Sequence, residues 1–165
     1  MKKIIFLTVI SIILSILNTS CTGYKPIYAT SNFNFIIEEH SIKGDEKLGN
    51  LIYRKLNNIS LSNKNNLNVQ SITLSIETKK ERKPTVKNSV GKILEYEIAL
   101  NTDIIINDFL TDKTILKQNF NYSISYKVQD EHSDTLKLEK QNIENLINKT
   151  YQDALIKISQ VTSSK

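Results

Sequence analysis

The sequence has few of the residues on which sites and cross-links are usually built. Its 165 residues include one cysteine, no tryptophan, two prolines, four glycines and two histidines. A single cysteine excludes a disulfide framework and a thiolate metal site, so the fold has to be stabilised by its core alone. The sequence also lacks a glycine-rich phosphate loop, a serine elbow and a zinc motif. These absences together indicate a protein that is not an enzyme.

The histidines and acids do not form a recognisable catalytic or metal-binding set. His40 and His132 stand in polar stretches that look like loops, without a nearby cysteine or a paired acid at ligand spacing. Six of the 17 acids are chain neighbours, in Glu38-Glu39, Asp45-Glu46 and Asp130-Glu131. Neighbours in the chain do not make an acid/base pair, which requires convergence in a pocket. We therefore expect no catalytic residue, no metal site and no cofactor, and we expect both histidines at the surface.

The one cysteine, Cys21, directly follows an apolar segment at the start of the sequence. Met1-Lys2-Lys3 is positively charged, residues 4–17 are predominantly apolar, and Asn18-Thr19-Ser20 are small or polar. These are the features of a signal peptide. A cysteine at the cleavage point resembles a bacterial lipoprotein signal, in which the thiol is lipidated and becomes the mature N-terminus. We therefore predict a lipoprotein signal peptide over residues 1–20 and lipid attachment at Cys21.

Two other interpretations of this segment stay open. One is an uncleaved membrane anchor, although the apolar run of 14 residues is shorter than the roughly 20 residues that a spanning helix needs. The other is an ordinary signal peptide with an incidental cysteine. The lipoprotein pattern has leucine three residues before the cysteine, whereas Asn18 stands there and Leu17 precedes it. Thr22 is not the aspartate that retains enterobacterial lipoproteins in the inner membrane, which favours the outer membrane.

The rest of the chain suits one domain of modest positive charge. Without residues 1–20 about 145 residues remain, which is enough for one domain with a core. Lys2 and Lys3 supply two of the net charges of +5, which leaves about +3. This is too little to indicate a nucleic-acid partner, and a secreted location argues against one as well. Residues 21–32, with Gly23 and Pro26, look like a lipidated tether, so the folded domain is expected over residues 33–165.

Hydrophobic periodicity predicts a strand and a helix at the start of this domain. Phe33, Phe35 and Ile37 alternate with other residues, which is typical of a strand. Asp45 can cap a helix that begins near Glu46. The helical stripe that follows consists of Leu48, Leu51, Ile52, Leu56 and Ile59.

Three long strands and a C-terminal helix complete the prediction. The alternating apolar residues of the strands are Ile72, Leu74 and Ile76, then Leu94, Tyr96, Ile98, Leu100, Ile104 and Ile106 with Thr102 as the exception, then Phe120, Tyr122, Ile124, Tyr126 and Val128. The last helix carries one apolar stripe from Ile143 to Val161 that can cover a sheet. We therefore predict an α+β fold in the order β-α-β-β-β-α: a four-stranded, mostly antiparallel sheet with two helices packed on one face.

The other side of these strands is small and polar. Its residues include Ser71, Thr73, Ser75, Asn121, Ser123 and Ser125. Strict alternation gives a sheet one buried face and one wet face. Such a face suits contact with water, and it equally suits the polar lumen of a β-barrel.

Basic residues cluster between Lys79 and Lys92, where Glu81 is the single acid. With Pro84 and Gly91, the segment Glu77–Lys92 is predicted to be a long connection or a hairpin tip. Two interpretations stay open. One is a solvated loop that also discourages edge-to-edge strand pairing. The other is an anion site for the phosphates of lipopolysaccharide. The candidate lipopolysaccharide-binding residues are Lys79, Lys80, Arg82, Lys83 and Lys87.

The residues from Cys21 to Tyr28, CTGYKPIY, resemble the Cys-Gly-aromatic-x-Pro-x-Tyr start of alphaproteobacterial members of the LPS-assembly lipoprotein (LptE) family, with Thr22 inserted. The β-α-β-β-β-α order in a chain of this size is similar as well. The resemblance implies a lipid-anchored protein on the periplasmic face of the outer membrane that plugs a large β-barrel, LptD, and assists its assembly. It also implies lipopolysaccharide as a ligand, which the pair places in the outer leaflet. The alternative is an accessory lipoprotein of outer-membrane protein folding or of a lipid-transport ABC system.

Overall fold

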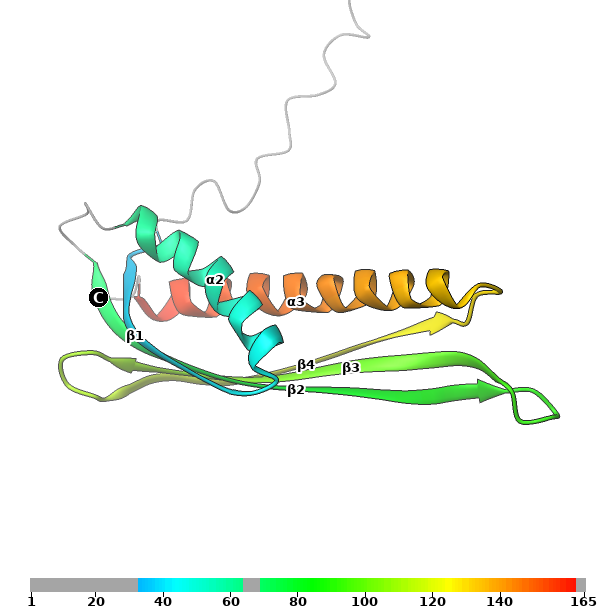
Figure 1. The fold of residues 1–165 in the computed structure, drawn as a ribbon. Helices are drawn as coiled ribbons and strands as arrows, with labels where there is room; N and C mark the ends of the chain where they lie inside the picture. Colours follow the sequence, from blue (N-terminus) through cyan, green and yellow to red (C-terminus); the bar gives the residue numbers. More distant parts are fainter. Residues whose placement is uncertain (1–32, 64–68, 163–165) are drawn as a thin grey trace, which may run out of the picture. The chain divides into compact units, whose positions relative to one another are not determined.

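A computed structural model describes residues 33–63 and 69–162, which form one sheet and two helices (Figure 1). The elements are β1 (Phe35–Gly44), α2 (Glu46–Ser62), β2 (Gln70–Lys87), β3 (Ile93–Asp108), β4 (Thr114–Lys127) and α3 (His132–Thr162). This order confirms the prediction. The predicted signal peptide, Cys21 and the tether lie outside the described residues.

The four strands lie in the order β1-β2-β3-β4. β1 runs parallel to β2, from Phe35 opposite Gln70 to Gly44 opposite Thr78. The β2–β3 and β3–β4 pairs are antiparallel. Parallel strands need a crossover connection, which α2 provides between β1 and β2. The sheet is therefore mixed but mostly antiparallel, as predicted.

Both helices pack on one face of the sheet, α2 on β1 and β2, and α3 on β3 and β4 (Figure 1). The core between the layers is built from the alternating apolar residues of the strands and the stripes of the helices. Its fully buried members include Phe35, Ile52, Leu56, Ile72, Leu74, Ile76, Ile98, Leu100, Ile104, Ile106, Ile147 and Leu155. Removing this apolar surface from water is the main favourable contribution to folding.

The junction between β1 and α2 is set by local chemistry. Gly44 has a φ of +76°, and a Cβ there would lie 2.2 Å from the carbonyl oxygen of Thr78, so glycine is required. The next residue, Asp45, donates its N–H to that same carbonyl at 2.7 Å. Its side chain accepts the N–H of Leu48 at 3.1 Å, which satisfies a free donor at the start of the helix. The helix therefore begins at Glu46, as the cap predicted.

The predicted connection over residues 77–92 is a hairpin tip only at its end, and the alternative of a long connection is wrong. β2 continues through the basic segment to Lys87, and only residues 88–92 form the turn to β3. The apolar alternation stops at Ile76 because, beyond Thr78, the side chains of β2 are exposed on both faces and β1 no longer lies alongside. Backbone pairing with β3 continues without that pattern, with Lys83 opposite Glu97. Pro84 is accommodated beside a register shift in the same ladder.

Candidate functional site

The sheet face opposite the helices, called the open face below, is polar, and none of the elements in the described ranges covers it (Figure 1). The polar residues predicted for one face lie here, from Ser71 on β2 to Ser125 on β4. Asn119 donates from Nδ2 to Asn101 Oδ1 at 2.6 Å and to Asp103 Oδ1 at 2.8 Å. The open face is therefore a hydrophilic surface rich in short polar side chains, several of which are bonded to one another.

The five basic residues predicted to bind lipopolysaccharide all lie on strand β2, where alternation divides them between the two faces. Lys79 and Lys83 lie on the open face, paired with Glu77 at 2.8 Å and with Glu97 at 2.9 Å. Hydrogen bonding to these carboxylates, and then their charge, raises the pKa of both lysines. Such exposed pairs are weak and are screened by salt. The cluster is therefore not one continuous cationic patch.

Lys80 and Lys87 are both exposed. Neither has an ion-pair partner among residues 33–63 and 69–162. They are thus more available to an external anion than the paired lysines of the same strand.

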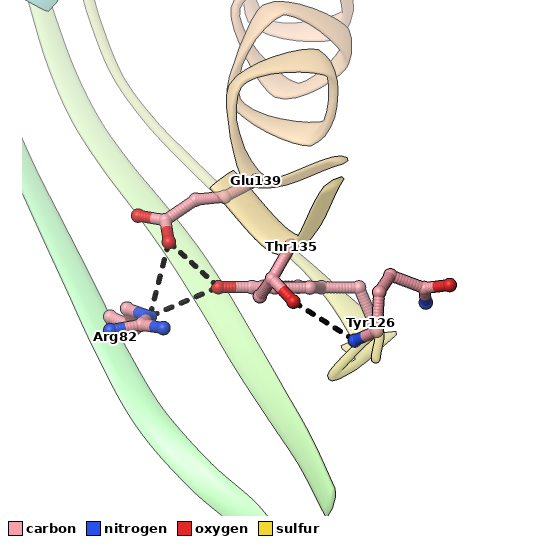
Figure 2. A network of polar contacts seen from close by, with 5 residues as sticks. Arg82, Tyr126, Thr135 and Glu139 are labelled. Carbon is pink, nitrogen blue, oxygen red and sulfur yellow. Dashed lines mark hydrogen bonds and ion pairs between the residues drawn. The ribbon is translucent and has the colours of Figure 1, made fainter. Parts of the chain in front are cut away.

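Arg82 belongs to a network that joins β2, β4 and α3, shown in Figure 2. Its Nε donates to Tyr126 Oη at 3.0 Å and lies 3.3 Å from Glu139 Oε2. Tyr126 Oη donates to the same carboxylate oxygen at 2.9 Å, and the guanidinium lies 3.6 Å from the centroid of the Tyr96 ring. Burial opposes the charge of Arg82, but the Tyr126 hydrogen bond and the Glu139 charge outweigh it and raise the pKa. Arg82 is therefore committed to contacts within its own chain.

A second tyrosine of β4, Tyr122, forms a hydrogen bond with α3 further along the helix. Tyr122 Oη donates to Asp153 Oδ2 at 2.5 Å, and Lys149 Nζ lies 4.4 Å from the centroid of the tyrosine ring. Burial and the contact with Asp153 raise the pKa of Tyr122 to about 12. The hydroxyl therefore keeps its proton, and can donate it to Asp153, at a higher pH than an ordinary tyrosine.

The turn of the β2–β3 hairpin presents apolar and basic side chains together. Asn88 Oδ1 accepts the N–H groups of Val90 at 3.1 Å and Lys92 at 2.8 Å, which shapes the turn. Val90 is 84% exposed, and Val86 and Leu94 are 43% and 42% exposed. This hairpin end, residues 83–94, also carries Lys83, Lys87 and Lys92. The sequence analysis found the lysines but did not single out Val86 and Val90, and it placed Leu94 among the apolar residues of a strand, where the structure leaves it exposed. The overlooked signal was an apolar side chain every four residues within a basic segment.

The histidines do not assemble a site. His40 lies in β1, so its predicted loop position is wrong, and its ring stacks on Tyr53 of α2 with centroids 3.8 Å apart. His132 is the first residue of α3 rather than a loop residue. In the described part of the chain, no three His, Cys, Asp or Glu side chains are grouped to hold a metal ion. Neither helix described by the structure has the length and apolar character to cross a bilayer.

Comparison with known proteins identifies the fold. No protein-family model matches the sequence, and no curated protein gives a reliable match. Among solved structures, an uncharacterised lipoprotein B from Nitrosomonas europaea matches with a TM-score of 0.56 at 12% identity, covering 87% of this chain and 94% of that one. A minor lipoprotein from Acinetobacter baumannii matches with a TM-score of 0.55 at 15% identity, covering 78% and 92%. At this identity the likeness establishes that the chain shares the fold of these two bacterial lipoproteins.

Proposed function

We propose that this protein is a non-enzymatic outer-membrane lipoprotein that plugs an LptD-type β-barrel, assists its assembly and takes part in lipopolysaccharide transport to the outer leaflet. In this proposal the lipid on Cys21 anchors it at the periplasmic face. The signal-like segment, the start from Cys21 to Tyr28 and the fold shared with bacterial lipoproteins support this proposal. The open face is the single observation on which it depends most.

A plug must present polar surface to a polar lumen, because barrel interiors are lined by polar residues. The open face meets this requirement: it offers serine, threonine and asparagine side chains over three strands, and both helices stay on the other side (Figure 1). β3 has 16 residues, which at roughly 3.3 Å per residue makes it about 50 Å long. The apolar band of an outer-membrane barrel is only about 25 Å tall. One sheet could therefore line the whole height of the lumen.

Lipopolysaccharide combines phosphates with acyl chains, and the hairpin end combines lysines with exposed valines and a leucine. Ammonium groups bind phosphate as point charges. Lys80 and Lys87 are unpaired within the described ranges, and the pairs of Lys79 and Lys83 are exposed enough to exchange Glu77 and Glu97 for a phosphate. Arg82 is removed from the proposed ligand set because it is held by Tyr126 and Glu139.

Co-purification tests the barrel partner. The tagged full chain, extracted from native membranes in mild detergent, is expected to bring down one large outer-membrane barrel protein, identified by mass spectrometry. Ser123→Arg with Ser125→Arg should reduce this recovery, because both substitutions add bulk and charge to the open face. Asn148→Arg with Gln152→Arg, at two exposed positions of α3, is the matched control. A pull-down without any barrel protein would contradict the proposal.

Depletion separates the proposal from its alternative. Selective loss of surface lipopolysaccharide supports the translocon role, because only that export would fail. A general loss of barrel proteins would instead favour an accessory of outer-membrane protein folding.

Charge-matched variants test the lipid site. Changing Lys79, Lys80, Lys83 and Lys87 to glutamine should weaken lipopolysaccharide binding by about tenfold or more and reduce its dependence on salt. The control changes four exposed lysines elsewhere to glutamine, namely Lys47, Lys117, Lys140 and Lys157. Equal binding by the two variants would contradict the lipid site. The basic residues of β2 would then serve only as a solvated strand edge that discourages edge-to-edge pairing.

A further inference from the structure

The β3–β4 turn presents two adjacent large apolar side chains. Phe109 is 40% exposed and Leu110 is 86% exposed. The turn that holds them is well bonded: Thr111 donates its N–H at 3.0 Å and its hydroxyl at 2.9 Å to Asp108 Oδ1, and Asp112 donates its N–H to the Asp108 carbonyl at 2.9 Å. This turn holds a phenylalanine and a leucine in water. Moving these two side chains into an apolar medium is therefore favourable.

The polar groups of the same turn are bonded within the sheet end. Asp108 also accepts Gln70 Nε2 at 3.1 Å, and Asp112 Oδ1 accepts Asn107 Nδ2 at 3.1 Å. The Asp108 carboxylate is thus bonded to Thr111 and Gln70 and the Asp112 carboxylate to Asn107, while Lys113 remains as an exposed cation at the base of the turn. Apolar side chains with a neighbouring cation suit the boundary between lipid headgroups and acyl chains, where the cation meets phosphate.

The turn lies at the end of the sheet where the described chain begins (Figure 1). Phe109 N donates to the Ser71 carbonyl at 3.1 Å. The neighbouring residue Gln70 donates its N–H to the Asn34 carbonyl at 2.9 Å. The start of β2 therefore connects the turn to residue 34 through two hydrogen bonds. Residue 33 follows residue 21 by 12 positions (33 − 21), which limits the reach of that segment to about 40 Å. The hairpin end is about 50 Å away along β3, so an anchor at residue 21 favours contact through the β3–β4 turn.

We propose that Phe109 and Leu110 insert into the membrane leaflet that holds the lipid on Cys21, as a second, non-covalent membrane contact. The inference rests on the lipid anchoring that is part of the proposed function. Its consequence is orientation: a covalent lipid alone leaves the domain free to turn about its attachment, whereas two contacts fix the sheet relative to the bilayer. The hairpin end is then directed away from the anchoring leaflet.

Single-cysteine labelling tests the contact in the full lipidated chain. Lipidation consumes the thiol of Cys21, so a cysteine introduced by Leu110→Cys is the one free thiol. Val90→Cys at the hairpin end is the matched control, because Val90 is 84% exposed and Leu110 is 86% exposed. Each protein is labelled with an environment-sensitive fluorophore and reconstituted into vesicles of phosphatidylethanolamine and phosphatidylglycerol without any barrel protein. We expect the label at residue 110 to be shielded from aqueous iodide by several-fold and quenched by shallow spin-labelled lipid, while the label at residue 90 stays in water.

Flotation with the vesicles reports the anchor separately from the tip. Flotation with both labels equally open to iodide would overturn the insertion of the tip and leave the anchoring intact. Loss of flotation would overturn both. Shielding of the residue 110 label that requires added barrel protein would assign the tip to that partner and overturn the lipid contact. Phe109→Ser added to the residue 110 variant should reduce the shielding, with unchanged circular dichroism showing that the domain stays folded.

Discussion

Replacing Arg82 with methionine tests whether this residue stabilises the fold or binds an external ligand. Methionine keeps an apolar stem that can pack on the Tyr96 ring but removes the charge and both polar contacts. A hydrogen bond to a charged group contributes about 1.5–3 kcal/mol, and a cation–π contact at a partly exposed site about 0.5–1 kcal/mol. The Arg82 side chain is 37% exposed and that of Glu139 17%, so the lower values apply. We expect a loss of about 2 kcal/mol in the free energy of unfolding, or about 8 °C in Tm for a domain of this size.

The measurement is thermal and urea unfolding followed by circular dichroism. Lys83→Met is the control, because it removes a cation from the same strand whose pair with Glu97 is exposed; its Tm should match that of the parent. Combining Arg82→Met with Glu139→Gln should cost less than the sum of the single changes, since both remove the same contact. Lipopolysaccharide binding by Arg82→Met should be unchanged. An unchanged Tm together with weakened lipopolysaccharide binding would refute the structural role.

Gly49→Ala should lower stability by about 1 kcal/mol in urea unfolding, although alanine is the better helix former, because the added Cβ would lie 2.6 Å from Ile42 Cγ2. Ile42→Ala in the same chain should recover part of that loss, and a stabilised single variant would contradict the close approach of α2 to β1. The pKa of Tyr122 is raised to about 12, so the stability from its contact with Asp153 is complete below about pH 10 and is lost as pH rises through about 12. The difference in stability between the parent and Tyr122→Phe should therefore close over that interval, and a constant difference would argue against the contact. Thr102→Val should raise stability by about 1 kcal/mol, because Thr102 Oγ1 is buried and no residue within the described ranges bonds it; a less stable variant would reveal a partner for that hydroxyl.

The sequence predicted the elements wherever one side of an element is buried. The alternation of Ile72, Leu74 and Ile76 marks β2 because those side chains face the helices. The same signal fails beyond Thr78, since a strand exposed on both faces has no reason to alternate. The length of β3, whose apolar alternation begins at Leu94, was the one clue that β2 had to continue as its partner.

The candidate site was predicted in composition but not in arrangement. Lys79 and Arg82 belong to one run of basic residues, yet the strand sends them to opposite faces of the sheet. The partners of Arg82 are 44 residues away, at Tyr126, and 57 residues away, at Glu139 (139 − 82). No local pattern links residues at such separations, because only the pairing of β2, β3 and β4 beneath α3 brings them together.

The sequence alone was enough to determine the order of strands and helices, the polar character of one sheet face and the place of the lone Cys21, because periodicity and composition act locally along the chain. Only the tertiary structure decided which basic residues remain available for an anion and which are held within the fold. It also decided that Phe109 and Leu110 share the end of the sheet where residue 34 enters it. The reason is physical: a side chain's partners, its exposure and its end of the sheet depend on strand register and layer packing, and these join residues that the sequence keeps far apart.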